Sequence, residues 1–528
     1  EISACLVGSE MCIRDSLLAV SMLATVALTG CSNTPAEESS SGNGGSGGDS
    51  STVDTSEHVK LILKVIGTEP NRYQEMMTAF NQMIADETDL NCELEVQWIG
   101  WGDYQTKYPL LFSSGESFDM AYTATWLDFA GIAMKGGMLD LTDMVEKYAP
   151  GVWEQVPDVG WEQSKVNGKI YCIPTGLATY SAQGYIYRGD LSDVEIKEGD
   201  WDSMKEYMKD VSGNGKGIQP MMFASSSNVL MQYGYSVENV FEIGTYTSLI
   251  IDPTEEDPQV HSFLDEEWMG DALDLVNDLS GYAWSESVLA NQTAASDCFD
   301  NGTSAAFYHN VDSYRSRPIK NPDWDIHWTN MRKYNETLSY AQDALCIPRT
   351  AANPERALML FDWMRTNQEA YDLFEYGTED MVTLNDDGTF TNLDPENWSC
   401  DACLWAIRTN EFFRNEEGWP TDYTEGHAVK LEETAIDNPY RILTLDTTNV
   451  ATQYSAVNNV YQQYIGQVDT GIMATEEGVK EFRDALYEAG LQTLIDEFQK
   501  QVDALEENYS DLIETYHEEL AEGKGIYF

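Results

Sequence analysis

Val59–Ile99 reads VKLILKVIGTEPNRYQEMMTAFNQMIADETDLNCELEVQWI. The apolar runs at its two ends, Val59–Ile66 and Cys92–Ile99, predict β-strands. Between them the large apolar residues recur at helical spacing, at Tyr73, Met76, Met77, Phe80 and Ile84. A strand–helix–strand unit is typical of a βαβ crossover, so this stretch predicts a parallel sheet with helices packed on it.

The same kind of pattern continues along the chain. We expect a helix near Asp103–Ser113 and short strands at Phe118–Tyr122 and Ser304–Tyr308, with a second α/β region from about residue 190 to 300. Near the end, one helix face carries the apolar residues Leu491, Leu494, Ile495, Phe498, Val502 and Leu505. An exposed face this apolar would promote association, so we expect it to pack on the folded body.

Composition and charge exclude several classes of protein. The chain has 528 residues, with 30 Lys and Arg against 90 Asp and Glu, and a formal net charge of −60. Apolar residues make up 42%, which indicates ordinary folding around a core rather than disorder. So acidic a surface repels phosphate backbones and anionic headgroups. We therefore exclude nucleic-acid binding and electrostatic docking to membranes.

The first 57 residues resemble no folded domain. Residues 1–16 fit no targeting segment, and we expect them to be non-native read-through. The apolar run Leu17–Leu28 has the length of a signal-peptide core, whereas a spanning helix needs about 20 residues. It leads into Leu28-Thr29-Gly30-Cys31, which resembles a bacterial lipobox, so we expect a signal peptide over 17–31 and lipidation of Cys31. The Gly- and Ser-rich tract 32–57 predicts a flexible tether.

The remaining cysteines form no obvious framework. They are scattered, at Cys92, Cys172, Cys298, Cys346, Cys400 and Cys403. Cys400 and Cys403 have CxxC spacing, but a zinc site needs a second pair of ligands, and we find none at suitable spacing. We favour free thiols, leave open whether Cys400 and Cys403 pair, and predict neither a metal nor a cofactor.

Several stretches together resemble a known family, the extracellular solute-binding proteins of ABC transporters of the carbohydrate-binding family 1 type. They are Ser113–Met120 (SSGESFDM), Gly168–Pro174 (GKIYCIP), Asn301–Tyr308 (NGTSAAFY) and Ile347–Met364 (IPRTAANPERALMLFDWM). Tyr376–Glu379, Asn438–Asn459 and Ala489–Leu505 resemble an additional C-terminal domain of unknown function found in one lipoprotein subgroup. The subgroup's Gly-Ile-Glu-Gly-x-His-Tyr motif is replaced here by Gly377-Thr378-Glu379-Asp380-Met381-Val382-Thr383.

The resemblance implies a type II periplasmic-binding-protein-like α/β fold, in which two discontinuous lobes joined by a hinge close on a ligand. On this basis we expect lobe 1 at 58–185 plus about 300–348, lobe 2 at about 186–299 plus 349–395, and a helical C-terminal domain over about 396–528. The implied protein is a monomeric, lipid-anchored receptor on the outer face of the bacterial cell membrane. It would deliver a carbohydrate to a permease driven by a separate ATPase, and it would not be an enzyme.

The candidate site follows from strand ends, because open α/β sheets bind ligands outside the carboxyl ends of their strands. Sugars present apolar faces and many hydroxyls, so aromatic platforms beside polar side chains suit them. The candidates for ligand contact are Glu69, Thr123, Trp126, Asp128, Tyr180, Trp284, Tyr308, His309 and Asn310. For each aromatic residue, packing in the core is the competing interpretation.

Three other classes of protein compete with this prediction. A glycosidase needs two placed carboxylates, and among 90 acidic residues no catalytic pattern stands out. A metal-dependent hydrolase fits worse, because His517-Glu518-Glu519-Leu520-Ala521 lacks the second histidine of HExxH. A peptide-binding receptor of the same fold is the closest competitor.

Overall fold

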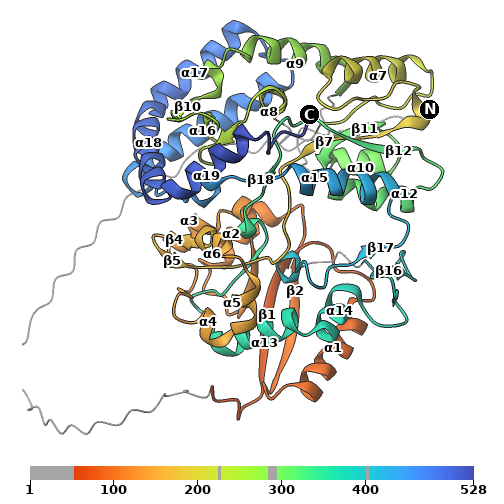
Figure 1. The fold of residues 1–528 in the computed structure, drawn as a ribbon, viewed down its shortest axis with the longest axis vertical. Coiled ribbons are helices and arrows are strands. Elements are labelled where there is room, and N and C mark those ends of the chain that lie inside the picture. The colour runs from red at the N-terminus through yellow and green to blue at the C-terminus, as the bar shows by residue number, and fades with distance from the viewer. Residues whose placement is uncertain (1–52, 224–227, 284–293, 400–403) are drawn as a thin grey trace, which may run out of the picture. The chain divides into compact units, whose positions relative to one another are not determined.

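The computed structural model describes residues 53–223, 228–283, 294–399 and 404–528. Residues 53–528 form one compact unit (Figure 1). Within it, two lobes are built on separate sheets and separate hydrophobic cores. The predicted signal peptide, Cys31, residues 32–52 of the predicted tether, Trp284, Cys400 and Cys403 lie outside the described residues. The end of the predicted tether is held to the first lobe, because Arg356 donates to the carbonyls of Asp54 and Glu57.

The first lobe is built on a five-stranded sheet. Its strand order is β2 (Cys92–Ile99), β1 (Val59–Ile66), β3 (Met120–Thr123), β14 (Ala344–Cys346), β6 (Ile173–Pro174). β1 pairs in parallel with β2 and β3, whereas β14 runs antiparallel to β3 and β6. The parallel strand–helix–strand unit predicted from Val59–Ile99 is therefore confirmed, with α1 (Tyr73–Glu87) as its crossover helix.

Short helices cover this sheet. They are α2 (Tyr104–Leu111), α3 (Phe129–Met134), α4 (Val145–Tyr148), α5 (Pro150–Gln155), α6 (Asp158–Gln163), α13 (Pro354–Thr366) and α14 (Gln368–Tyr376). Phe80 of α1 packs against Trp363 of α13 and Phe374 of α14, with ring centroids 5.9 and 5.0 Å apart. Small two-stranded and three-stranded sheets flank the lobe: β4 (Lys165–Val166), β5 (Lys169–Ile170), β15 (Val382–Leu384), β16 (Thr389–Asn392) and β17 (Asn415–Glu416).

The second lobe has two antiparallel sheets. In the first, β7 (Gln183–Arg188) lies between β11 (Ala306–Asn310) and β12 (Ile326–Asn330). The second consists of β8 (Phe241–Glu242), β9 (Leu249–Ile251) and β10 (His261–Ser262). Its helices are α7 (Trp201–Gly213), α8 (Val229–Val237), α9 (Met269–Ala283), α10 (Ala294–Asp300), α11 (Asp312–Arg315), α12 (Arg317–Lys320) and α15 (Ala428–Thr434).

The lobe boundaries differ from those expected. We assigned 300–348 to the first lobe and 349–395 to the second, but β11 and β12 pair with β7, and α13 and α14 pack in the core of β1. Residues 404–407, expected in the C-terminal domain, also belong to this first core. The local sequence of β11 or β12 does not show which sheet the strand joins, because strand pairing is set by long-range packing.

The C-terminal helices complete the second lobe. They are α16 (Ala451–Asp469), α17 (Glu476–Ala489), α18 (Leu491–Asn508) and α19 (Ser510–Ala521) (Figure 1). The apolar face of α18 enters the same core as β7 and α9, as predicted. The break between α17 and α18 falls at Gly490, whose φ of +110° favours glycine and whose position leaves no room for a Cβ beside Gln453.

Segments that cross between the lobes, at 175–182, 331–340 and 417–422, form the hinge. Two of them are bonded together: the N–H of Leu338 donates to the carbonyl of Thr179 (2.8 Å), and that of Ser181 donates to Glu336 (2.9 Å). The Glu336 side chain is buried and binds the guanidinium of Arg441 at 2.6 Å. Burial acts to raise the pKa of Glu336, but Arg441 and Arg332 hold that pKa below its usual value.

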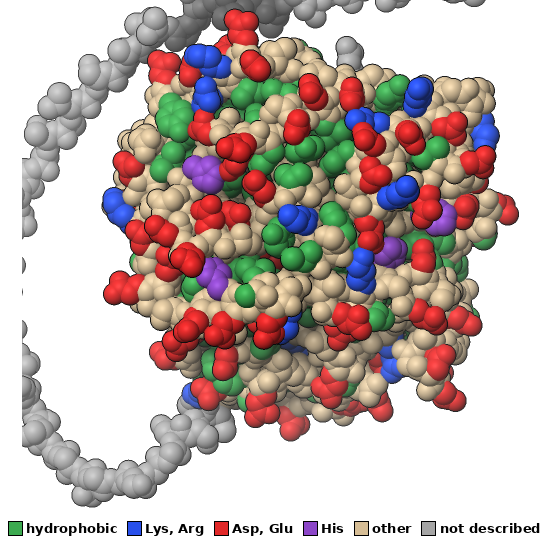
Figure 2. All heavy atoms as spheres, turned by 45° about the horizontal axis from the view of Figure 1, so that its top comes forward, with side chains coloured by type: hydrophobic (Ala, Val, Ile, Leu, Met, Phe, Trp, Pro, Cys, Tyr) green, Lys and Arg blue, Asp and Glu red, His purple; other side chains and the backbone are tan. Residues whose placement is uncertain are grey.

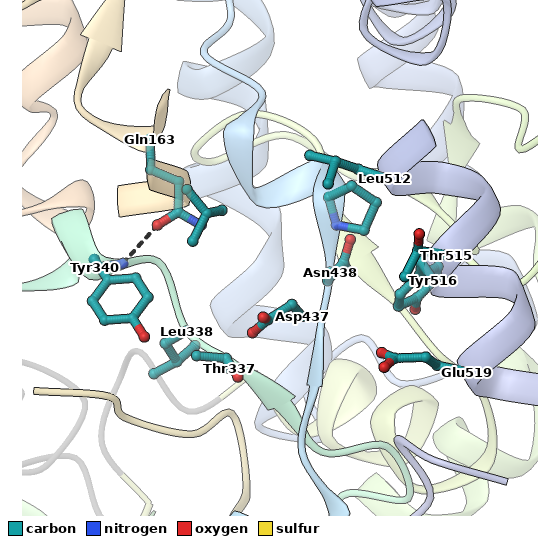
Figure 3. Close-up of a pocket in the computed structure, with 12 residues that line it drawn as sticks. Gln163, Thr337, Leu338, Tyr340, Asp437, Asn438, Leu512, Thr515, Tyr516 and Glu519 are labelled. Carbon is teal, nitrogen blue, oxygen red and sulfur yellow. Dashed lines mark hydrogen bonds between the residues drawn. The ribbon is translucent and has the colours of Figure 1, made fainter. Parts of the chain in front are cut away.

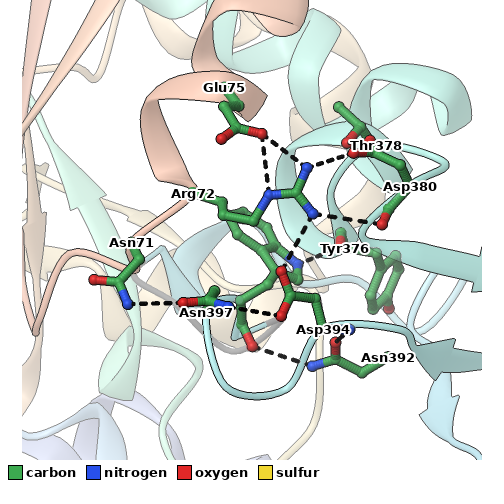
Figure 4. A network of polar contacts seen from close by, with 10 residues as sticks. Asn71, Arg72, Glu75, Tyr376, Thr378, Asp380, Asn392, Asp394 and Asn397 are labelled. Atoms are coloured by element: carbon green, nitrogen blue, oxygen red, sulfur yellow. Dashed lines mark hydrogen bonds and ion pairs between the residues drawn. The ribbon is translucent and has the colours of Figure 1, made fainter.

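The segment that departs from the subgroup motif is tied to the start of α1 (Figure 4). Arg72 pairs with Glu75, Asp380 and Asp394, and the Asn71 amide donates to Asn397 at 3.2 Å. Nearby, the buried indole of Trp398 donates to the carbonyl of Tyr376 at 2.7 Å. These contacts give residues 376–398 a structural role in the first lobe.

The acidic composition is visible on the surface. Figure 2 shows Asp and Glu side chains spread across one face of the molecule, with Lys and Arg much sparser among them. The described cysteines are free thiols, with Cys92, Cys172 and Cys346 buried and Cys298 half-buried. Among the described residues, no helix is both long and apolar enough to cross a membrane.

One buried carboxyl gives the stability a pH dependence. Asp469, at the end of α16, is 4% exposed and accepts from the N–H of Leu230 at the start of α8. Burial raises the pKa of Asp469 to about 8, although the backbone N–H groups of Leu230 and Val229 act to lower it. The pKa of an Asp side chain in the unfolded chain is about 3.9. Because only the unfolded state loses the proton between about pH 4 and 8, the free energy of unfolding should fall as the pH rises through that range.

Asp469→Asn mimics the protonated side chain and should flatten this slope. We expect it to raise the free energy of unfolding at pH 8 by on the order of 1–3 kcal/mol and to change little at pH 4. Urea unfolding at both pH values measures the difference, with the exposed Asp496→Asn as the matched control. A parallel pH slope in Asp469→Asn and wild type would contradict the assignment.

Candidate functional site

Strand ends of the first lobe meet at one edge of its sheet. Because β1, β2 and β3 are parallel, the residues that follow them share this edge. Trp101 follows β2, and Trp126 follows β3. β14 is antiparallel to β3, with Ala344 opposite Thr123, so the residue before β14, Asp343, reaches the same edge.

Aromatic rings line this edge, and we call them the aromatic cluster: Trp101, Tyr104, Tyr122, Trp126 and Trp405. Trp101 stacks on Trp126 and on Trp405, with ring centroids 6.4 and 5.9 Å apart and planes at 25° in both pairs. Trp126 is 38% exposed, and its indole N–H donates to the carbonyl of Gln342 at 3.2 Å. The cluster therefore offers a supported and accessible indole face.

Charged groups lie beside the cluster. The Tyr122 hydroxyl donates to Asp343 at 2.5 Å. Burial raises the pKa of Asp343, while Tyr122 and Arg408 act in the opposite direction. Arg408 lies over the Trp405 ring at 5.9 Å and pairs with the buried Glu375 at 3.2 Å. The edge thus combines ring faces with a carboxylate and a guanidinium, which together supply hydrogen-bond acceptors and donors.

The second lobe brings polar side chains from the end of β11 and from α11. His309 is exposed, and its Nδ1 lies 2.5 Å from the Ser313 hydroxyl and 3.1 Å from the Asn310 side-chain oxygen. The protein around His309 disfavours its charged form and lowers its pKa. Arg315 of α11 lies over the ring of Phe413 at 5.5 Å, and Arg408 of the first-lobe edge lies over the same ring at 5.8 Å, so α11 lies beside that edge.

The structure places the predicted residues in different surroundings. Trp126 is in the aromatic cluster, and His309 and Asn310 lie at the end of β11. Glu69 is exposed after β1, where it accepts from the Gln74 amide at 2.6 Å. Tyr180 lies in a hinge segment, opposite Thr337.

Three predicted residues contribute to the packing or the local structure of the fold. Thr123 is completely buried, because every residue of β3 is covered on both faces, so it presents no exposed surface to a ligand in this structure. Tyr308 is half-buried and packs edge-to-face on Tyr185 in the second core. Asp128, in the left-handed region at φ +55°, accepts from the N–H of Gly131 and starts α3. Trp284 lies outside the described residues.

Sequence reasoning missed six members of the site: Trp101, Tyr104, Tyr122, Trp405, Asp343 and Arg408. Trp101 is the second residue after β2, and the strand-end rule applied to that strand would have found it. Asp343 precedes an antiparallel strand, a place the rule does not cover. Trp405 was assigned to the C-terminal domain, and only the folded structure brings it to the edge.

A cavity of about 190 Å³ lies beside the hinge (Figure 3). Gln163 accepts from the N–H of Tyr340 on one side, and Leu512, Thr515 and Glu519 of α19 face the other. Pockets for drug-sized ligands usually hold about 300–1,000 Å³. The cavity is smaller and contains no tryptophan, so we place the candidate ligand site at the aromatic cluster instead.

Together, the two-lobed fold and the accessible aromatic edge define a protein that binds a solute between lobes. Residues 71–371 match the family described as bacterial extracellular solute-binding protein, and 441–507 match a domain of unknown function, DUF3502. The first match spans more than half of the chain, so the protein belongs to the bacterial extracellular solute-binding proteins.

Individual relatives agree with this assignment. A Streptococcus pneumoniae serotype 4 protein named carbohydrate ABC transporter substrate-binding protein is 24% identical over 481 residues, which cover 85% of this chain and 92% of that protein. The crystal structure of the N-glycan transport solute binding protein NgtS from Streptococcus pneumoniae with Man1GlcNAc has a TM-score of 0.71 at 19% identity, covering 85% of this chain and 99% of that one.

A third similar structure is an HMO-binding solute-binding protein associated with an ABC transporter of Bifidobacterium longum infantis. Its TM-score is 0.56 at 15% identity, and the match covers 84% of this chain and 99% of that one. At these identities the structural likeness establishes the fold, and it confirms the expected two-lobed α/β architecture with a helical C-terminal region.

Proposed function

We propose that this protein is the substrate-binding component of an ABC importer and captures an oligosaccharide between its lobes without altering it. The observation that carries the proposal is the aromatic cluster beside Asp343 and Arg408 at the strand-end edge. The apolar face of a pyranose ring stacks on an indole, and its hydroxyls need groups that donate and accept hydrogen bonds. The similar proteins named above, a carbohydrate transporter component, an N-glycan transport protein and an HMO-binding protein, support the same class of ligand.

The proposed cycle needs two states of the hinge. Sugar bound to the first-lobe edge would be covered by His309 and α11 of the second lobe, and closure would bury the sugar further. A ligand that binds only the closed state stabilises it by mass action, by about 2.7 kcal/mol at a hundredfold excess over the dissociation constant. The permease and its ATPase, which would open the closed form, are separate chains in this proposal.

A panel of oligosaccharides and peptides tests the proposal. The panel contains Man5GlcNAc, Man1GlcNAc, cycloalternan and maltose, the glycans of similar structures, and a peptide mixture. We expect one class of glycan to raise the unfolding temperature by several degrees, to shrink the radius of gyration in solution scattering, and to be recovered unchanged. Shifts with peptides alone would favour the peptide receptor, and released sugar products would indicate an enzyme.

Anchoring is part of the same proposal. We propose that Cys31 carries the lipid and that residues 32–52 tether the lobes to the outer face of the cell membrane. Several acyl chains on one residue hold a protein firmly, whereas a single chain holds it only marginally.

Cys31→Ser, in a version with a complete secretion leader, should therefore move nearly all of the protein from the membrane fraction to the medium. Cell fractionation after a high-salt wash measures this, and Ser32→Ala serves as the neighbouring control, expected to stay with the membrane. If the Cys31→Ser protein remained membrane-bound, the anchor assignment would be wrong.

A further inference from the structure

Two members of the candidate site, Trp405 and Arg408, come from a segment outside the first-lobe sheet. None of the five strands of that sheet includes residues 405–410. The Trp405 ring nevertheless stacks on Trp101, which lies just after β2, with ring centroids 5.9 Å apart. Other contacts must therefore hold this segment against the edge of the sheet.

Thr175 makes such contacts. It directly follows β6, which pairs with β14, and it is 1% exposed. Its N–H donates to the carbonyl of Asp343 at 2.8 Å. Its hydroxyl donates to the carbonyl of Arg408 at 3.1 Å and lies 3.4 Å from the carbonyl of Trp405. One buried residue thus connects two parts of the site that are far apart in the sequence.

Gly176 extends this connection. Its N–H donates to the same Arg408 carbonyl at 2.8 Å, and its carbonyl accepts from the N–H of Asn410 at 3.2 Å. The close approach depends on the missing side chain, because an added Cβ would lie 2.5 Å from the guanidinium of Arg365. Arg365 is completely buried and donates to the carbonyl of Pro174 at 2.5 Å, so it has little freedom to move away. The two segments are therefore fixed side by side.

We propose that Thr175 is a positioning residue of the sugar site, which holds Trp405 and Arg408 in place beside Asp343. This rests on the proposed function and deepens it, because it names a residue on which the geometry of that site depends. Thr175 is too buried to touch a ligand and acts only through the groups that it bonds. A hydroxyl suits this position, because it donates to a carbonyl, which a valine of similar shape cannot do.

Thr175→Val removes the hydroxyl and keeps both the shape of the side chain and the N–H. We expect this variant to bind the best glycan of the panel about tenfold more weakly, because residues 405–410 lose a bond that fixes their position. Thr175→Ser keeps the hydroxyl and should bind within about threefold of wild type. Isothermal titration calorimetry measures both affinities.

Thr88→Val is the matched control. The Thr88 hydroxyl also donates to a carbonyl, that of Ile84 at 2.7 Å, and also accepts from the N–H two residues further on, as that of Thr175 does. Thr88 precedes β2, whereas the aromatic cluster lies beyond the other end of that strand. Thr88→Val should therefore lower the unfolding temperature and leave the affinity unchanged.

A spectroscopic measurement follows the site without a ligand. Stacked indoles such as Trp405 and Trp101 couple their excited states, and this coupling gives paired bands of opposite sign in circular dichroism. Trp405→Ala shows which share of the bands comes from this pair. We expect Thr175→Val to reduce that share, whereas Thr175→Ser and Thr88→Val should keep it. A role of Thr175 in stability alone would leave the bands unchanged.

Two further variants test how Thr175 acts. Gly176→Ala adds a methyl group between the two segments, and it should reduce the affinity and the paired bands in the same way. Added to Trp405→Ala, Thr175→Val should weaken binding by less than about threefold more, since part of its effect passes through the ring already removed.

The outcomes separate the two proposals. If Trp126→Ala weakens binding while Thr175→Val binds as wild type does, the positioning role is overturned and the proposed function stands. Equal losses of affinity in Thr175→Val and Thr88→Val would also overturn the positioning role, as would unchanged paired bands in Thr175→Val. If wild type binds no glycan of the panel, the proposed function fails and the sugar-site role of Thr175 fails with it, even where the bands show that Thr175 holds Trp405.

Discussion

Trp126→Ala should abolish most of the rise in unfolding temperature that a bound oligosaccharide causes, and should weaken binding about 10- to 100-fold. Trp126 is the accessible ring of the aromatic cluster, stacked on Trp101 and fixed by its bond to Gln342. Such anchored aromatic residues contribute most of the binding free energy at many sites, about 2 kcal/mol or more each. Isothermal titration calorimetry with the best glycan of the panel measures the loss.

The unfolding temperature of the ligand-free protein should change little, because Trp126 is partly exposed and its ring leaves no buried cavity. Trp153→Ala is the matched control. Trp153 stacks on Trp161 at 4.6 Å in the first lobe, among the core residues and away from the aromatic cluster. Its loss should lower the unfolding temperature and leave the affinity unchanged. The opposite pattern in the two variants would place Trp126 in the core and refute its assignment.

Truncation after Gly490 should leave a protein that aggregates or unfolds far below the wild-type temperature. It removes α18, whose Leu491, Leu494, Phe498 and Val502 are fully buried in the second-lobe core. The remaining apolar surface of the lobe would be exposed to water. Light scattering and differential scanning calorimetry measure the effect, and a soluble truncated protein with an unchanged melting profile would contradict the integral packing of α18.

A single substitution tests the same packing of α18 and gives a change in the free energy of unfolding that can be measured. Phe498→Ala removes a completely buried ring and should lower the free energy of unfolding by about 3–5 kcal/mol. Ile472→Ala in the same C-terminal region is the control. Ile472 is 71% exposed, so its change should stay within about 0.5 kcal/mol. Urea unfolding followed by circular dichroism compares them.

Local patterns predicted local structure well. β1, α1 and β2 were found because their apolar residues repeat at the strand and helix periods within one short stretch. The apolar face of α18 was found for the same reason. The allocation to lobes failed for β11, β12, α13 and α14, because local periodicity does not show which distant sheet or core an element joins.

The candidate site, like the fold, was predictable only where local sequence marks a residue's position. Trp126 follows a strand whose carboxyl end could be recognised in the sequence. Asp343 and Trp405 could not be found this way, since one precedes an antiparallel strand and the other is brought in from a distant part of the chain.

The interleaved lobes also constrain how the chain acquires its structure. The first core needs residues 61–173 and 341–407, and the second combines strands from 183 onward with α18 near the end. When the first half of the chain has been synthesised, neither core therefore has all of its residues. Long-range pairings of this kind are slow to form, because the intervening loop must be closed before any contact rewards it. Both lobes should accordingly complete their folding late, after synthesis. Until then β1, α1 and β2 can form only part of the first-lobe sheet, which β14 completes.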